Sequence, residues 1–152
     1  MSNTAEIKSE NKIIELATFY VGGAVCGMDI LKIQEINKLM EMTQVPQAPE
    51  YVLGILNLRG QIVTIIDLAR KLGLTSTQVN EKTRNIIVNS KSEHVGLLVD
   101  KISDVISADK TKIEPPPVNL GGVQGKYFKG VFKTSKLLVG ILEIEEVLKS
   151  DQ

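Results

Sequence analysis

The sequence has little of what catalysis, metal binding or nucleic-acid binding usually requires. It contains one histidine, one cysteine, no tryptophan and 4% aromatic residues. A zinc site needs several His, Cys, Asp or Glu ligands within reach of one another, so we expect no metal and no cofactor. The 18 basic and 18 acidic residues cancel. A neutral chain with few aromatics lacks the basic, stacking surface that binds nucleic acid.

Other absences constrain where the protein works. None of its apolar runs approaches the ~20 residues that a membrane-spanning helix needs, and the first dozen residues lack the apolar centre of a signal peptide. The single cysteine, Cys26, has no partner for a disulfide within the chain, which fits a reducing compartment. We therefore expect a cytoplasmic protein that does not insert into a membrane, with a flexible polar tail over residues 1–12.

What the chain does contain is an internal repeat. Residues 54–68 recur 76 positions later as residues 130–144, with their apolar positions matched, and upstream Gly27 matches Gly96 at an offset of 69. Self-similarity of this kind indicates two units of like fold. A unit of about 60 residues buries only ~60% of its unfolded-chain surface. We therefore expect one domain over residues 13–150, built from two subdomains at about 13–80 and 81–150.

The two copies differ in length and in a few residues. The offset grows by seven, which predicts a longer loop in the second copy, placed within residues 115–130. Residues kept in both copies, such as Gly27, Gly96 and Gly54, are expected to serve the fold. Arg59 occurs only in the first copy, because Ser135 takes its place in the second. We therefore consider Arg59 a candidate functional residue, with a solvated turn residue as the alternative.

One set of residues has the composition of a catalytic triad. Ser103, His94 and Asp100 are close in sequence, but Ser103 takes the place of Gln34 in the repeat. This favours chance placement on a pair of strands, and a small phosphatase is the enzyme alternative. The glycines before Lys126 also miss the spacing of a P-loop. We expect no catalytic residues.

Short runs of Ile, Val, Leu and Thr punctuated by glycine predict an all-β chain with five strands per copy, which suggests two small barrels. Arg59 and Gly60 are expected to form a type II or type I′ turn, with Gly60 at a position that needs positive φ. Short helices are expected over 67–72 and 143–148. The expected strands lie near residues 13–20, 24–30, 33–43, 54–58, 62–66, 84–90, 94–100, 102–107, 127–132 and 136–142.

Four segments carry motifs that occur together, in this order, in one known family. They are residues 27–36 (GMDILKIQEI), 43–54 (TQVPQAPEYVLG), 57–68 (NLRGQIVTIIDL) and 95–105 (VGLLVDKISDV). They resemble the bacterial chemotaxis coupling proteins of the CheW family, and the resemblance covers about residues 13–148. Thr64 departs from the pattern, because the family usually has proline there.

The resemblance implies two intertwined five-stranded barrels of the Src-homology-3 type and a non-enzymatic adaptor. Its partners would be the regulatory domain of the histidine kinase CheA and the cytoplasmic tip of a chemoreceptor in arrays at the membrane. A receptor helix would lie in an apolar groove between the barrels. The alternative that the isoleucines of this groove belong to the core stays open, as do the residues that bind the kinase. By position, the groove residues would be Ile30, Ile33, Glu35, Ile36, Arg59 and Val99.

Overall fold

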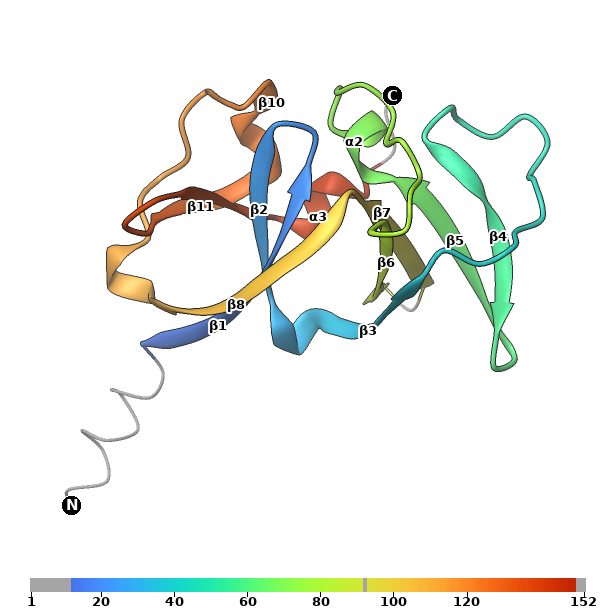
Figure 1. Ribbon diagram of the computed structural model, residues 1–152, viewed down its shortest axis with the longest axis horizontal. Helices are drawn as coiled ribbons and strands as arrows, with labels where there is room; N and C mark the ends of the chain where they lie inside the picture. Colours follow the sequence, from blue (N-terminus) through green and yellow to red (C-terminus); the bar gives the residue numbers. More distant parts are fainter. Residues whose placement is uncertain (1–11, 92, 150–152) are drawn as a thin grey trace, which may run out of the picture.

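The computed structural model describes residues 12–91 and 93–149, so the expected tail over residues 1–12 lies outside the described residues apart from Lys12. Within them the chain forms short strands and tight turns (Figure 1). The strands are β1 (Ile13–Val21), β2 (Ala24–Asp29), β3 (Ile33–Lys38), β4 (Val52–Leu58), β5 (Gln61–Asp67), β6 (Arg84–Ser90), β7 (Glu93–Val99), β8 (Lys101–Asp109), β9 (Asn119–Leu120), β10 (Val123–Gln124), β11 (Phe128–Lys133) and β12 (Leu138–Leu142).

Helical turns punctuate the strands. The four-residue helix α2 (Leu68–Lys71) follows β5, and α3 (Ile144–Val147) follows β12. Three 3-10 turns are also present, η1 (Ile30–Lys32), η2 (Lys110–Lys112) and η3 (Gly125–Tyr127). The all-β class and the two short helices expected from the sequence are thus confirmed.

The long strands form two five-stranded sheets. Sheet A has the order β11-β12-β2-β1-β8, and sheet B has the order β3-β6-β7-β5-β4. We call the two units barrel A and barrel B. Each contains one parallel pair, β12 with β2 in barrel A and β5 with β7 in barrel B. When repeat counterparts are matched, the two strand orders are the same, so the expectation of two like-folded units is confirmed.

The barrels do not coincide with the two sequence repeats. Barrel B is one stretch of chain, residues 33–99, whereas barrel A combines β1 and β2 from the first copy with β8, β11 and β12 from the second. The chain crosses from barrel A to barrel B at η1 and returns at Asp100 (Figure 1). The boundary expected near residue 80 therefore separates the repeats but cuts through barrel B, because each copy contributes strands to both sheets.

The pairing register places two repeated glycines at equivalent positions. Gly27 lies opposite Thr18, and Gly96 lies opposite Ile87, the repeat counterpart of Thr18. A Cβ on Gly27 or Gly96 would come within 2.9 or 2.4 Å of a branched side chain on the neighbouring parallel strand. Gly54 similarly leaves room for a carbonyl oxygen, which would lie 2.7 Å from its Cβ. These glycines serve close packing, as the repeat indicates.

The seven extra residues of the second copy lie in two places. The isolated bridges Thr43–Ile55 and Glu114–Val131 are equivalent, yet Glu114 follows Thr43 by 71 positions and Val131 follows Ile55 by 76. Two extra residues therefore precede Glu114, outside the expected loop, and five follow it. The later part contains the β9-β10 hairpin and η3, and it is anchored by the fully buried side chain of Val123.

One apolar cluster joins the two barrels. Phe19 and Met28 of barrel A and Ile86 and Leu97 of barrel B are fully buried in it, together with residues of α2 and α3. Each barrel also has a smaller cluster of its own. A single apolar core therefore extends from one barrel through the interface into the other.

Candidate functional site

The turn between β4 and β5 holds Arg59 in an exposed position. The φ angles are +52° at Arg59 and +84° at Gly60, the pattern of a type I′ turn. The side-chain Oδ1 of Asn57 accepts a hydrogen bond of 2.8 Å from the Gly60 amide. Asn57 and Gly60 thus serve the turn. A positive φ is uncommon for any residue with a Cβ, and arginine has no advantage over other residues there. The turn itself therefore does not require arginine at position 59.

Arg59 forms an ion pair with Glu35 of β3. Its Nη2 contacts Oε2 of Glu35, while Asn37 Nδ2 donates a 3.0 Å hydrogen bond to Oε1. Glu35 follows a β-bulge after Ile33, and a bulge redirects the side chains beside it. The Arg59 side chain is 69% exposed. Such an exposed pair contributes about 0–1 kcal/mol to stability, so its main effect is to orient the guanidinium.

The isoleucines near this pair are only partly covered. Ile30 and Ile36 are 37% and 40% exposed, and Leu31 between them in sequence is 88% exposed. Ile33 is half-buried and packs against the shared cluster. Ile30 and Ile36 are therefore accessible to a partner, whereas Ile33 serves both the core and the surface.

A cleft of about 450 Å³ lies where the two barrels meet. It runs between β3 and β6 of barrel B and α3, which follows the last strand of barrel A. Ile33 is the one predicted groove residue that lines it, and Ile30 lines a separate cleft beside β1. The residues that line the cleft between the barrels are Leu31, Lys32, Ile33, Gln34, Val88, Asn89, Ile144 and Glu145.

Val99 does not belong to this surface. Its side chain is 0% exposed and lies in the shared cluster. The chain leaves β7 at this residue, and the next residue, Asp100, accepts a hydrogen bond from the Gly22 amide at 2.9 Å. Val99 therefore lies in the apolar cluster shared by the barrels, just before the chain crosses to barrel A. The expectation that it lines the groove is corrected: it is a core residue.

Several exposed apolar residues were not among the expected site residues, and Leu31 and Ile62 are two of them. Leu31 stands where the second copy has Asp100, so the repeat comparison that singles out Arg59 also singles out Leu31. Ile62 of β5 is 58% exposed, and its counterpart Leu138 is 36% exposed. Both barrels thus present an apolar side chain at the start of the strand after the equivalent turn, β4-β5 in barrel B and β11-β12 in barrel A.

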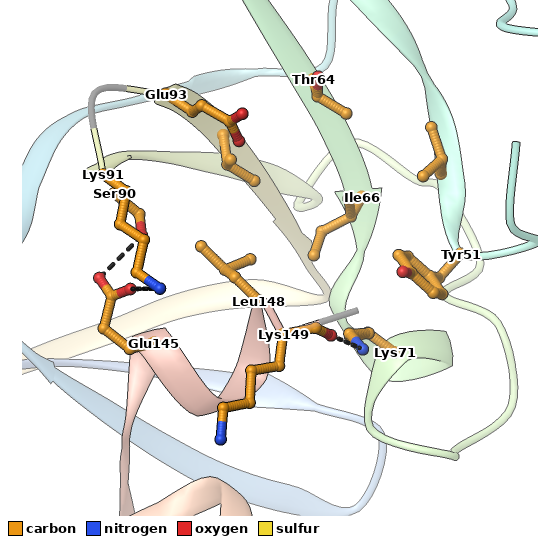
Figure 2. A pocket seen from close by; sticks show the side chains of 12 residues that line it. Tyr51, Thr64, Ile66, Lys71, Ser90, Lys91, Glu93, Glu145, Leu148 and Lys149 are labelled. Atoms are coloured by element: carbon orange, nitrogen blue, oxygen red, sulfur yellow. Dashed lines mark hydrogen bonds and ion pairs between the residues drawn. The ribbon is translucent and has the colours of Figure 1, made fainter. Parts of the chain in front are cut away.

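A third cleft, of about 280 Å³, lies between β5, β7 and α3 (Figure 2). Lys71 Nζ donates to the Lys149 carbonyl oxygen at 2.8 Å and lies 4.7 Å from the centre of the Tyr51 ring. Ser90 Oγ donates to Glu145 Oε1 at 2.8 Å, as Figure 2 shows. Glu145 lines this cleft and also the cleft between the barrels, so it stands between the two.

The described residues offer little for catalysis. No group of three or more potential metal ligands occurs within residues 12–91 and 93–149. Burial raises the pKa of the Cys26 thiol to about 12, so this thiol stays protonated and is a poor nucleophile near neutral pH. No helix in the same part of the chain is long and apolar enough to cross a membrane.

Two joined barrels with an exposed arginine, accessible isoleucines and clefts at the junction have the features of a protein-binding module. Comparison with known proteins identifies which kind. The model of the CheW-like domain family matches residues 15–152, and the chain belongs to that family. It is a chemotaxis adaptor, and its barrels have the Src-homology-3-like fold that the sequence implied.

Relatives and a solved structure extend this match over almost the whole chain. The chemotaxis protein CheW of Helicobacter pylori is 33% identical, over 95% of this chain and 87% of its own length. CheW of Bacillus subtilis is 30% identical, over 97% of this chain and 93% of its own length. The scaffolding protein TtCheW of Thermoanaerobacter tengcongensis superposes with a TM-score of 0.83 at 30% identity, covering 91% of this chain and 89% of that structure.

Proposed function

We propose that this protein couples chemoreceptors to the histidine kinase CheA, without catalysing a reaction itself. It would act in the cytoplasm and be recruited to receptor arrays at the membrane. The observation that carries the proposal is the Arg59–Glu35 pair. It holds an exposed cation against β3, the strand that also carries the partly exposed Ile36. The chain belongs to a family of chemotaxis scaffolds, and the turn that holds Arg59 does not require an arginine.

The receptor tip is the partner that fits this surface. An amphipathic helix binds a groove through apolar anchors spaced along one face. Ile33 supplies an apolar contact in the cleft between the barrels, and Ile30 and Ile36 supply further exposed apolar side chains. Arg59 supplies a charge that can meet an acidic or carbonyl group on the helix. The kinase would bind a different surface, so that both partners are held at the same time.

The test uses a receptor cytoplasmic-tip fragment and the regulatory domain of CheA. Isothermal titration should give binding to each fragment, and size-exclusion chromatography should give a complex that contains all three. Arg59→Ala should weaken binding of the receptor fragment and leave kinase binding close to wild type. Lys136→Ala is the matched control, because it removes a cation from the equivalent turn of barrel A.

Two results would count against the proposal. If saturating receptor fragment displaced the kinase domain competitively, one surface would serve both partners and the coupling role would fail. If Lys136→Ala weakened receptor binding as much as Arg59→Ala, the effect would reflect general charge and not the Arg59 surface.

A further inference from the structure

Barrel B contains a polar pair where barrel A has an apolar one. Asn37 of β3 lies directly opposite Asn85 of β6. Their repeat counterparts are Ile106 and Leu16, which lie directly opposite one another in β8 and β1. Leu16 is fully buried in the small core of barrel A, and Asn85 is likewise 0% exposed. The two barrels therefore place different chemistry at the same pair of positions.

The polar pair is unfavourable for the stability of the barrel. Oδ1 of Asn37 and both amide atoms of Asn85 are buried without a hydrogen-bond partner among residues 12–91 and 93–149. A buried polar group without a partner loses its hydration and destabilises the folded state. Because barrel A accommodates leucine and isoleucine at these positions, the fold itself does not need the amides.

The amide of Asn37 connects the barrel interior to the exposed turn. Its Nδ2 donates to one oxygen of Glu35, and the other oxygen of Glu35 pairs with Arg59. In barrel A the counterparts of Glu35 and Arg59 are Asp104 and Ser135. No hydrogen bond joins their side chains in the described part of the chain. The connection from interior to surface is thus a property of barrel B.

Asn85 is placed to hold the amide of Asn37. Residues directly opposite one another on antiparallel strands have their Cβ atoms about 4.5–5.5 Å apart. Asn85 Nδ2 is an unpaired donor and Asn37 Oδ1 is an unpaired acceptor, and the pairing register puts the two side chains on the same face of the sheet. A hydrogen bond between them would give an order of donation from Asn85 to Asn37 and from Asn37 to Glu35.

We propose that Asn37 and Asn85 are positioning residues, which fix Glu35 and through it the orientation of the Arg59 guanidinium. The consequence for partner binding rests on the proposed function, whereas the orientation of Arg59 does not. The direct test replaces the pair with the one in barrel A, as Asn37→Ile combined with Asn85→Leu. This double variant should fold with equal or higher thermal stability, because it replaces both members of a buried polar pair by the apolar pair that barrel A accommodates.

Binding and its coupling to Arg59 provide the first measurement. The double variant should bind the receptor-tip fragment about tenfold more weakly, the size expected for one lost hydrogen bond to a charged group. In an Arg59→Ala background the same two replacements should have no further effect, because the residue through which they act is gone. If the two losses instead multiplied, Asn37 and Asn85 would influence binding by another route and the proposal would be wrong.

A second measurement does not depend on any partner. The Nε–Hε signal of Arg59 in an NMR spectrum should be distinct in the wild type, and it should move toward that of a free arginine in the double variant, as in Glu35→Gln. An unchanged signal in a folded double variant would overturn the proposal. If the wild type bound no receptor fragment, the proposed function would fail while this test still stood. Should the double variant not fold, Asn37→Ala removes the same donor with a smaller change.

Discussion

Replacing Arg59 and Gly60 separately should distinguish a binding residue from a structural one within a single turn. Arg59→Ala removes an ion pair whose arginine is 69% exposed, so the free energy of unfolding should fall by no more than about 0.5 kcal/mol. Alanine keeps the positive φ of arginine at this position, so the backbone strain is unchanged. Thermal and urea unfolding of the variant should therefore be close to wild type.

Gly60→Val should behave differently. The φ of +84° at Gly60 is unfavourable for a β-branched residue, and the loss should be about 1–3 kcal/mol. Among the described residues, no heavy atom lies within 4 Å of the position that a Cβ on Gly60 would take. The loss of stability should therefore come from the backbone alone, without a steric clash.

Binding to the receptor-tip fragment should show the opposite order. If Arg59 anchors the partner, Arg59→Ala should cost about 1–3 kcal/mol of binding free energy, which is roughly a ten- to hundredfold loss of affinity. Arg59→Glu should cost more, because it reverses the charge that faces the partner. An equal drop in melting temperature for Arg59→Ala and Gly60→Val would make the arginine structural. Unchanged affinity in Arg59→Ala would make it a solvated turn residue.

Three further predictions follow from packing and burial. The continuous core should make both barrels unfold in one cooperative step, so two separate transitions in calorimetry would show that the interface is weak. Gly96→Ala should destabilise by about 1–3 kcal/mol, because its Cβ would lie 2.4 Å from a side chain of β5, whereas Gly23→Ala, with no described atom within 4 Å, is the control in urea unfolding. Because the pKa of the Cys26 thiol is raised to about 12, this group contributes stability that is fully present below the pKa of the unfolded thiol, ~8.5, and is lost as pH rises toward 12. Cys26→Ser should reduce that loss, and alkylation of native protein at pH 8 should be slow; rapid labelling would mean that the thiol is accessible.

Much of the fold was predictable because strand positions follow from apolar runs and turn glycines. The strand expected over 84–90 has those bounds, but the one expected over 33–43 ends at Lys38, since the chain leaves the sheet there and regains a single bridge at Thr43. Repetition in sequence does not specify which copy supplies the partner of each strand. Residue patterns therefore show that there are two units, but only the strand pairing shows which strands belong to which barrel.

The candidate site was predictable where the two copies differ at an exposed position, as at Arg59. It was not predictable at Val99, whose apolar character suits a groove as well as a core. Asn37 and Asn85 also gave no signal, because single asparagines on a strand resemble solvent-facing residues. Their importance depends on lying opposite one another inside the barrel, and that is a property of the register.

The exchange of strands at η1 and Asp100 has a consequence for how such a chain can arise. A single repeat would carry a hairpin whose partners lie in another copy, so two identical chains would complete one another as a strand-swapped homodimer with twofold symmetry. The present chain has the architecture of that dimer joined end to end. Once joined, its halves can vary independently. The first half can then carry Arg59 and Asn37, and the second half can carry Asn85, which faces Asn37 in barrel B, while both halves retain the glycines that packing demands.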